Sequence, residues 1–494
     1  MKSTTKLFNI QNKFMSGIPM KSFSNVCKVD NPYTQKLHIE KPFHTQKDIK
    51  TFLEKAEGAS SFLSSVSLDQ RIHICKEAMN WFKTNSLKVA TEITNSMGKP
   101  VSQGLGEINV MIDRCNNLCD MSREALQDDI VQIDSTNMIK IKKEPIGISF
   151  IISPWNYPLI TTINSLIASI LCGNPVILKH SVRTPIVGDF FAEAFKAVGP
   201  NDVVQHLFLD GKDIPSIYSH EKINYVGFTG SVDTGKTVLK NLANSQRFIH
   251  SVFELGGKDP AYVRADADLE AAVAGVVDGA MYNAGQSCCS LERVYVHESL
   301  YDKFVDLAVE EASKITLGNP LGNLSDGSNV VYPNMGPMAL PDSIMQIKDQ
   351  VDKAGEAGAD ILLGGNISTD EEGLGRFFKP TILANCDNTM DIMQSETFGP
   401  VLPISKVYSD NEAIEKMNDS QFGLTAAVYS KDYSEAEKIC SQLNSGTVFL
   451  NRCDSLHPRL PWSGRKESGI GIGLSKYAFG AFYRTKGYNF NLPK

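Results

Sequence analysis

The chain has 494 residues, of which 42% are hydrophobic and 21% are charged. This length makes one small domain improbable and predicts two or three packed units around a large core. Lys and Arg number 49 and Asp and Glu number 56, so the formal net charge is −7. Such an acidic chain is not suited to neutralising phosphates, and no nucleic-acid partner is expected.

The most apolar stretch, residues 159–172, is interrupted by Thr and Asn side chains before about 18 apolar residues accumulate, so no membrane span is predicted. The ten cysteines are scattered without CxxC pairs, which favours a reducing compartment. Cys115 and Cys119 have no histidine at zinc-ligand spacing, so we interpret them as core thiols and predict no metal site.

The amino-terminal segment, residues 1–29, carries five lysines, no acidic residue and apolar residues at helical spacing. This composition is typical of a mitochondrial transit peptide. Because the segment contains no arginine, a disordered basic tail is the alternative. The predicted localisation is therefore the mitochondrial matrix or the cytoplasm.

After this segment the chain alternates between helical and strand-like patterns. Helical apolar spacing covers 53–88 and 107–126, and 130–143 alternates apolar and polar residues around a Ser135–Thr136–Asn137 turn, which predicts a protruding hairpin. Short β-rich runs follow at residues 147–152, 175–178, 204–208, 223–228 and 251–255. Strands separated by helices predict a parallel sheet of the nucleotide-binding α/β type.

A second α/β series begins near Asp268. Helices are predicted from Leu269, from Leu300 and over 411–417. Strands are predicted near Ile361 and Ile404 and at 426–429 and 447–450. The chain therefore contains a second α/β domain.

Residues 230–237 read GSVDTGKT, which satisfies the phosphate-binding pattern G-x-x-x-x-G-K-[ST] after a strand-like run. A nucleoside triphosphatase would also need a downstream strand ending in a magnesium-binding Asp, and the next strand ends in Glu254 instead. The alternative is a turn that caps a helix whose amino end faces a dinucleotide pyrophosphate. A P-loop nucleotide hydrolase is kept as a minor hypothesis.

Three residues are candidates for chemistry. Cys288 follows Gly285 in a polar cluster that is unusual for a packing cysteine, so it is either a nucleophile or a structural thiol, while Cys289 beside it is expected to point elsewhere. Glu254 lies between apolar residues, where burial would raise its pKa towards that of a general base; a salt-bridged or capping carboxylate is the alternative. Asn156, in the rigid PWNYP loop after a predicted strand, could donate to an oxyanion, unless the loop is only a stiff turn.

Taken together, these motifs resemble those of the aldehyde dehydrogenase superfamily: PWNYP at 154–158, FTGS at 228–231, ELGGKDP at 254–260, GQSC at 285–288, ETFGPV at 396–401 and PWSGRKESGIG at 461–471. The resemblance spans roughly residues 30 to 494. It implies an α/β fold with a Rossmann-like cofactor domain, an α/β catalytic domain and a small β oligomerisation element.

The resemblance also implies domain boundaries. They are 30–122 and 146–256 for the NAD(P)-binding domain, 257–450 for the catalytic domain, 123–145 and 482–494 for the oligomerisation element, and 451–481 for a carboxyl-terminal return segment. A homodimer or homotetramer is expected.

Carried over by motif, Cys288 is the nucleophile that attacks the aldehyde, and the Asn156 amide with the Cys288 N–H holds the oxyanion. Glu254 activates the water that hydrolyses the thioester to a carboxylic acid. Members that pass the acyl group to coenzyme A lack this Glu, so the resemblance favours hydrolysis.

For the cofactor, the resemblance implies Lys179 at the adenosine ribose, Gly230 and Ser231 at the pyrophosphate, and Trp155, Glu396 and Phe398 on the nicotinamide side. NAD is predicted first. NADP is a serious competitor because Val182 stands where many members have a Glu that repels a 2′-phosphate, and Arg183 beside it could assist that phosphate.

The substrate is expected to be a small-molecule aldehyde. The KHS form at 179–181 is similar to that of some succinate-semialdehyde dehydrogenases, for which Arg114, Arg452 and Arg459 are candidate carboxylate partners by charge. An apolar aldehyde fits the aromatic residues near the site equally well. A non-catalytic binding protein on the same fold is the alternative to an enzyme.

Overall fold

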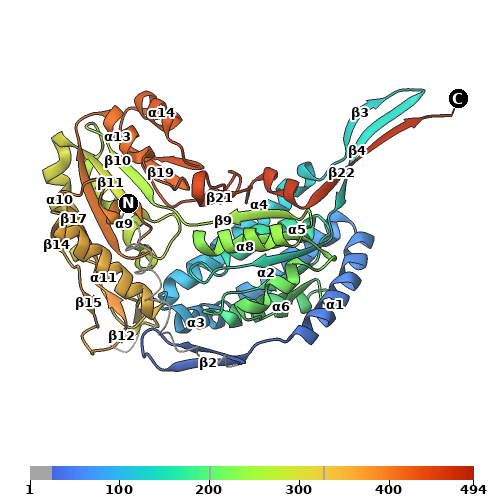
Figure 1. Ribbon diagram of the computed structural model, residues 1–494, viewed down its shortest axis with the longest axis horizontal. Coiled ribbons are helices and arrows are strands. Elements are labelled where there is room, and N and C mark those ends of the chain that lie inside the picture. The colour runs from blue at the N-terminus through green and yellow to red at the C-terminus, as the bar shows by residue number, and fades with distance from the viewer. Residues whose placement is uncertain (1–24, 200–201, 326–328, 494) are drawn as a thin grey trace, which may run out of the picture.

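The computed structural model describes residues 25–199, 202–325 and 329–493. In these residues the main elements form two large sheets and a smaller one (Figure 1). The α/β fold class predicted from the sequence is therefore confirmed.

The first large sheet has six strands in the order β21-β9-β8-β5-β6-β7. The five strands from β9 to β7 are mutually parallel, and β21 joins the edge in the antiparallel direction. Buried parallel strands read as continuous apolar runs, which explains the β-rich segments of the sequence. The strands are β5 (Ile148–Ile152), β6 (Val176–Lys179), β7 (Val204–His206), β8 (Ile223–Thr229), β9 (His250–Glu254) and β21 (Gly469–Ile470).

The helical pattern predicted over 53–88 is divided among three helices. The first break lies at Ser67, whose hydroxyl accepts from the backbone of Gln70 in a capping box that starts a new helix. The helices of this part of the chain are α1 (Gln46–Ser65), α2 (Leu68–Thr84), α3 (Ser86–Met97), α4 (Val101–Ala125), α5 (Ile160–Leu171), α6 (Pro185–Lys196), α7 (Pro215–Tyr218) and α8 (Val232–Asn244).

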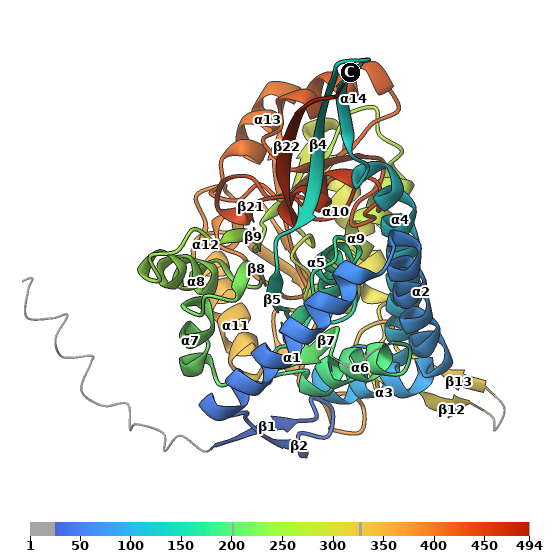
Figure 2. The same cartoon turned by 90° about the vertical axis from the view of Figure 1, so that its right-hand side faces the viewer.

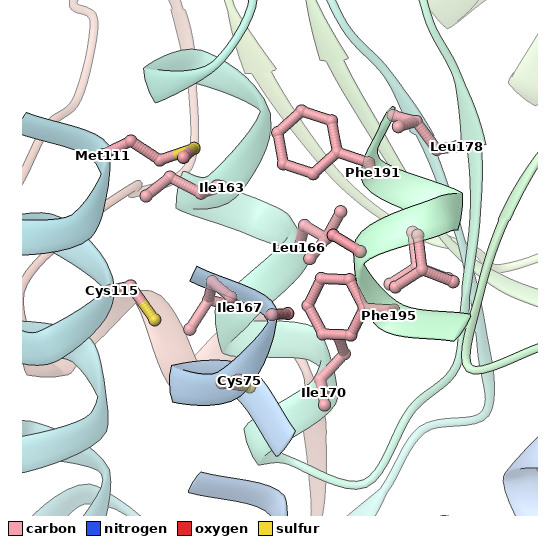
Figure 3. Packing of buried hydrophobic residues seen from close by; sticks show 14 of the residues in the cluster. Cys75, Met111, Cys115, Ile163, Leu166, Ile167, Ile170, Leu178, Phe191 and Phe195 are labelled. Atoms are coloured by element: carbon pink, nitrogen blue, oxygen red, sulfur yellow. The ribbon is translucent and has the colours of Figure 1, made fainter. Parts of the chain in front are cut away.

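Helices α2, α4, α5 and α6 enclose the largest apolar core. Figure 3 shows Met111 and Cys115 of α4 against Ile163 and Ile167 of α5, with phenylalanines of α6 on the other side. Cys115 and its neighbour Cys119 are free and buried, so the interpretation as core thiols agrees with the structure. In the described residues no group of three or more His, Cys, Asp or Glu side chains is arranged to hold a metal ion.

The second large sheet has seven strands in the order β14-β17-β18-β11-β10-β19-β20, and only β14 is antiparallel to its neighbour. Its strands are β10 (Asp259–Val263), β11 (Leu291–His297), β14 (Asp360–Leu363), β17 (Thr381–Ala384), β18 (Val401–Val407), β19 (Thr425–Tyr429) and β20 (Thr447–Leu450). The helices that follow or precede them are α9 (Leu269–Met281), α10 (Glu298–Ser313), α11 (Pro341–Glu356), α12 (Asp391–Gln394), α13 (Asp410–Asn418) and α14 (Tyr433–Gln442).

The predicted hairpin is present as β3 (Asp129–Ile133) and β4 (Asn137–Pro145), and the carboxyl-terminal strand β22 (Tyr483–Asn491) pairs along β4. These three strands project from the body of the protein (Figures 1 and 2). Every residue of β3 is exposed. The hairpin prediction is confirmed, and the arrangement leaves an open sheet edge.

One boundary of the sequence analysis is wrong. Residues 26–29, assigned to the tail, form most of β1 (Val26–Asp30), which pairs with β2 (Leu37–Pro42) and buries Val29. This strand was taken for part of the basic tail because it contains Lys28. Lys28 is exposed, whereas the residues on either side of it are buried. Residues 1–24, the rest of the predicted transit peptide, lie outside the described residues. No helix in the described part is long and apolar enough to cross a membrane.

The remaining short elements are β12 (Asn323–Ser325), β13 (Asn329–Val331), β15 (Ile367–Ser368), β16 (Phe377–Phe378) and the 3₁₀ turns Gly211–Asp213, Tyr282–Gly285, Lys466–Ser468 and Lys476–Ala481.

Candidate active site

One cavity of about 1060 Å³ collects all nine residues that the sequence analysis proposed as site residues. The parallel strands β5, β6, β8 and β9 end at this cavity, where ligands commonly bind in open α/β sheets. The opposite wall comes from the loops that precede β11 and β18. The nine residues are Trp155, Asn156, Lys179, Gly230, Ser231, Glu254, Cys288, Glu396 and Phe398.

Cys288 follows a turn with unusual backbone geometry. Asn283 and Ala284 have φ of 54° and 57°, and Gly285 has φ of 67°. A Cβ on Gly285 would lie 2.1 Å from the carbonyl oxygen of Gly399, so only glycine permits this approach. Left-handed non-glycine residues store strain that the surrounding structure must support, and they cluster at functional sites.

The Gln286 side chain supplies part of that support. Its Nε2 donates to the carbonyl of Asn283 at 3.1 Å, and its Oε1 accepts from the backbone N–H of Ala339 at 2.9 Å. Gln286 and Asn283 are both buried. The partly exposed Cys288 thiol is therefore presented to the cavity by a rigid turn.

Asn156 is linked directly to the same turn. Its Nδ2 donates to the carbonyl of Gln286 at 3.2 Å, and Asn283 Nδ2 donates to the carbonyl of Asn156 at 3.2 Å. The first bond uses one of the two hydrogens on the Asn156 amide. Asn156 also lines the cavity that contains Cys288.

Glu254 ends β9 and is 8% exposed. Thr229 donates to its Oε2 at 3.4 Å, and Oε1 has no hydrogen-bond partner in the described residues. Burial raises the pKa of this carboxyl to about 7, while the Arg114 guanidinium, Thr229 and Asn164 act in the opposite direction. A carboxyl that titrates near neutral pH is suited to general-base work.

Glu396 is held by the backbone of the loop after β9. Its Oε1 accepts from the N–H of Gly257 at 3.0 Å, and a Cβ on Gly256 would lie 2.4 Å from its Oε2. Burial and then the nearby Glu292 raise the pKa of Glu396 to about 8. Gly256 of the ELGG motif therefore makes room for this carboxyl, and Gly257 donates its N–H to it.

The segment that carries Glu396 and Phe398 is fixed by a carboxylate that the sequence analysis missed. Glu292, the second residue of β11, accepts from the N–H groups of Thr397 and Phe398 at 2.7 and 2.8 Å. Lys258 neutralises it at 2.8 Å, and both side chains are almost fully buried. The sequence offered one indication of this role, namely a carboxylate inside the strand sequence LERVYVH.

Trp155 and Phe398 approach each other across the cavity from the two halves of the chain. Their ring centroids are 5.7 Å apart in a T-shaped arrangement, and Phe398 has φ of 52°. Edge-to-face contact of this kind is favourable for aromatic rings. The pair therefore joins the PWNYP loop to the loop before β18.

Lys179 ends β6, and burial lowers its pKa to about 8, against the attraction of Cys27 and Asp210. Val182, which stands where a Glu was expected, is 42% exposed and lines the cavity. The suggestion that Arg183 could assist a second phosphate is not supported. Its guanidinium is buried and turned to Asp30, at 2.5 Å, a carboxylate that also pairs with Arg376.

Residues 230–237 do not form a P-loop. Ser231 is at the N-cap position of α8, where its hydroxyl donates to the Thr234 hydroxyl, and the Gly230 N–H donates to the carbonyl of Glu254 at 3.1 Å. Lys236 points outward, 60% exposed, and pairs with Glu467 at 2.5 Å, while the Thr237 hydroxyl donates to the carbonyl of Asp233. The sequence matches the phosphate-binding pattern by coincidence, because Lys236 and Thr237 lie in α8 beyond the turn at Gly230 and Ser231.

Cys289 points away from the cavity, as expected, and its Sγ donates to Oδ1 of Asp454 at 2.8 Å. Of the arginines considered for a substrate carboxylate, Arg452 and Arg459 are exposed and contact Ser455 and Asn117. Arg114 is buried, and its Nη1 donates to the carbonyl of Ile160 and to Oδ1 of Asn164. None of the three lines the cavity.

Comparison with known proteins adds independent findings. The sequence model described as "Aldehyde dehydrogenase family" matches residues 20–487. A protein of Davidiella tassiana named aldehyde dehydrogenase is 32% identical over 485 residues, covering 98% of this chain and 94% of that protein.

Two solved structures are similar over nearly the whole chain. A betaine aldehyde dehydrogenase from Staphylococcus aureus in complex with NAD⁺ has a TM-score of 0.88 and 29% identity, with 96% of this chain and 93% of that chain covered. A 3,6-anhydro-L-galactose dehydrogenase in complex with NAP has a TM-score of 0.88 and 28% identity, with 95% and 97% covered.

Proposed function

This chain belongs to the aldehyde dehydrogenase family, and we propose that it oxidises a small aldehyde to the carboxylic acid with NAD(P)⁺ through a thioester on Cys288. One observation carries the proposal. A thiol, an oriented amide and a carboxyl with a pKa near 7 line the same cavity. These are the nucleophile, the oxyanion donor and the base that acyl transfer to water requires.

The residues of the cavity fit a dinucleotide. Its volume of about 1060 Å³ is at the upper end of the range of about 300 to 1,000 Å³ for ligand pockets. Ser231 and Thr234, at the amino end of α8, line it, and the free N–H groups of a helix start are suited to a pyrophosphate. Lys179 would hold the adenosine ribose, and Glu396 with Phe398 and Trp155 would hold the nicotinamide ribose and ring.

NAD⁺ is the first choice of cofactor and NADP⁺ the second. Val182 presents no carboxylate to repel a 2′-phosphate, and no hydrogen-bond donor to bind one. The comparison structures with NAD⁺ and with NAP support this pair of candidates.

In the first half of the reaction, the Cys288 thiolate attacks the aldehyde carbon and forms a thiohemiacetal. The Asn156 amide and the Cys288 N–H stabilise the negative oxygen. When bound, the nicotinamide supplies a hydride acceptor, so the substrate carbon is oxidised to a thioester on Cys288.

In the second half, Glu254 takes a proton from water as the water attacks the thioester carbon. The carbon–sulfur bond breaks, the acid leaves, and Cys288 returns as the thiolate. The protonated Glu254 carboxyl then releases its proton to solvent. The presence of this carboxyl favours hydrolysis over transfer to a thiol acceptor.

The test is NAD⁺ and NADP⁺ reduction by the purified protein with succinate semialdehyde, hexanal and benzaldehyde. We expect reduction of at least one cofactor, loss of turnover in C288A, and retention of one equivalent of reduced cofactor per site in E254Q. Cofactor binding without turnover on any aldehyde would replace the enzyme by a non-catalytic binding protein, and full turnover in C288A would show that Cys288 is not the nucleophile. A preference for succinate semialdehyde would indicate a cationic site for the aldehyde chain, and a preference for hexanal would indicate an apolar one.

We also propose that the protein is a homo-oligomer assembled through β3, β4 and β22. The exposed strand β3 carries Ile130, Val131 and Ile133, each more than half exposed. Open strand edges with apolar side chains are normally covered.

We propose that the protein is located either in the mitochondrial matrix or in the cytoplasm. The basic composition of residues 1–24 supports the mitochondrial matrix.

A further inference from the structure

Three carboxylates of the described residues line the cavity, and the proposed function uses only two of them. Glu254 and Glu396 have roles in it, whereas Asp210 has none. The few polar groups of a ligand pocket usually fix the orientation or the identity of the ligand. Asp210 is therefore a candidate for recognising one part of the bound molecule.

The order of strands places Asp210 far from the catalytic groups. Glu254 ends β9 and Asp210 follows β7, and these two strands are the outermost of the five parallel ones. Four spacings of about 4.8 Å separate them, or roughly 19 Å. Lys179 ends β6, which pairs directly with β7, and the Leu207 N–H donates to the carbonyl of Leu178 at 2.8 Å. Asp210 therefore lies on the Lys179 side of the cavity.

Contacts through β1 also connect the segment before Asp210 with Val182. The Cys27 thiol of β1 donates to the carbonyl of Val182 at 3.5 Å. Cys27 belongs to the same apolar cluster as Phe208, which is two residues before Asp210. Cys27, Val182 and Asp210 all line the cavity. The carboxylate is therefore in the part of the cavity where Val182 offers none.

The Asp210 carboxylate contacts Lys212 on its solvent side. Its Oδ2 lies 3.3 Å from Nζ of Lys212, and its Oδ1 accepts from the backbone N–H of Lys212 at 3.4 Å. The two side chains are 28% and 48% exposed, and water weakens an ion pair of this kind. Lys212 itself does not line the cavity. The cavity is therefore negatively charged at this position.

We infer that Asp210 is a specificity-determining residue that selects NAD⁺ over NADP⁺. Its carboxylate accepts a hydrogen bond from the 2′-hydroxyl of the adenosine ribose and repels a 2′-phosphate, and both effects favour NAD⁺. Asp210 thus supplies, from the end of β7, the carboxylate that is missing at Val182. The inference rests on the proposed binding of a dinucleotide in this cavity.

The test is isothermal titration calorimetry of the full-length protein with NAD⁺ and with NADP⁺, in the absence of aldehyde. D210N removes the charge and keeps an oxygen that can accept from the Lys212 N–H, a position where Asn is as favourable as Asp. We expect the Kd for NADP⁺ to fall about tenfold, because the repulsion is lost. The Kd for NAD⁺ should change less than about threefold, because the amide oxygen can still accept from a hydroxyl.

A second variant and an altered ligand identify the contact. D210A removes the acceptor, and a hydrogen bond to a charged group is worth about tenfold or more in affinity, so the Kd for NAD⁺ should rise by about that factor. The wild-type protein should bind 2′-deoxy-NAD⁺ about tenfold more weakly than NAD⁺ for the same reason. D210A should bind the two ligands equally.

D213N is the matched control. Asp213 lies in the same turn, and its Oδ1 accepts from Nε2 of Gln46 at 3.2 Å, but it does not line the cavity. D213N removes the same charge three residues away. It should leave the Kd values for NAD⁺ and NADP⁺ within about twofold of wild type.

An unchanged Kd for NADP⁺ in D210N, the same change in D213N, or equal affinities of the wild type for NAD⁺ and 2′-deoxy-NAD⁺ overturns the inference. If D210N does not fold, the wild-type comparison of NAD⁺ with 2′-deoxy-NAD⁺ decides. Aldehyde oxidation is tested separately by turnover. A protein that binds as expected but oxidises no aldehyde keeps the inference and loses the proposed reaction, whereas a protein that binds neither dinucleotide loses both.

Discussion

Gly473 leaves the space that Oε1 of Glu254 occupies: a Cβ on Gly473 would lie 2.2 Å from that oxygen. The two residues are more than 200 positions apart in the sequence. Gly473 is held there by paired backbone hydrogen bonds with Trp462, each of 2.7 Å. The carboxyl-terminal segment therefore forms one wall around the proposed base.

The first prediction concerns this contact. G473A should displace the Glu254 carboxyl and slow thioester hydrolysis by about 10²-fold, the lower end of what general-base catalysis contributes. The initial burst of p-nitrophenolate from p-nitrophenyl acetate should persist, because acetylation of Cys288 does not use Glu254. G480A is the control, since nothing lies within 4 Å of a Cβ there. Equal rates in both variants would contradict the prediction.

The second prediction is the pH dependence of hydrolysis. Burial raises the pKa of Glu254 to about 7. Below that pH the carboxyl carries a proton and cannot accept another, so the steady rate should fall as pH decreases through about 7 and level off above it. The pH profile of p-nitrophenyl acetate hydrolysis by wild type and E254Q measures this. The variant should show a low rate without that inflection.

The third prediction compares two lysines. K179M should raise the KM for NAD⁺ by about 10- to 100-fold, because a hydrogen bond to a charged group contributes about 1.5 to 3 kcal/mol, while kcat changes little. K236M, which alters the lysine of the P-loop-like string, should leave both constants unchanged because Lys236 is exposed and paired with Glu467. Measured NAD⁺ titrations with a working aldehyde check both. Magnesium-dependent phosphate release abolished in K236M would favour the nucleotide hydrolase.

The pKa of Lys179 adds a pH signature. Burial lowers it to about 8, so the lysine is mostly charged at pH 7 and loses its charge as pH rises above 8. Cofactor affinity of the wild-type protein should therefore weaken between pH 7 and 9. The affinity of K179M should be lower and independent of pH over the same range, as measured by protein fluorescence on titration with NAD⁺.

The fourth prediction concerns stability. K258M removes the cation from Glu292 and leaves a buried carboxylate without its counter-charge. Breaking a buried ion pair costs about 3 to 5 kcal/mol, so we expect a loss of that size in the free energy of unfolding by urea. K258M/E292Q should recover part of it, because the neutral amide no longer needs the cation. A loss below 1 kcal/mol in K258M would show that the pair is not needed for stability.

The fifth prediction concerns assembly. V131K together with I133K places charges on the exposed edge strand β3, which should shift the protein towards smaller species in size-exclusion chromatography with light scattering. L87K, on the surface of α3, is the control because Leu87 is equally exposed, at 63%. An oligomer of unchanged mass in the edge variant would move the interface elsewhere.

Much of the site was predictable because its residues lie in short motifs. The segments around Gly285 and Cys288 and the PWNYP loop differ in composition from a packed core. The order of the motifs along the chain indicated that they contribute to one site. The hairpin was predictable for a similar reason. Alternating apolar residues around Ser135–Thr136–Asn137 indicate two strands and a turn without any long-range information.

Local pattern failed where a side chain's direction decides its role. The string at 230–237 matches a phosphate-binding loop, yet Lys236 lies on the outer side of α8. Arg183 is next to a cavity residue, yet its guanidinium turns to Asp30, on another strand. A one-residue step along the chain changes the direction of a side chain completely, and only packing against distant segments determines which direction is taken.

The sequence alone indicated the family, the order of strands and helices, and the residues proposed as nucleophile, base and oxyanion donor, because these depend on residue identity and short spacing. Only the tertiary structure decided the surroundings of the proposed base. Gly473 lies more than 200 positions from Glu254 in the sequence, yet a Cβ there would lie 2.2 Å from Glu254 Oε1, and burial raises the pKa of this carboxyl to about 7. Electrostatic interaction depends on distance in space and on exclusion of water, and neither is written in the spacing of residues along the chain.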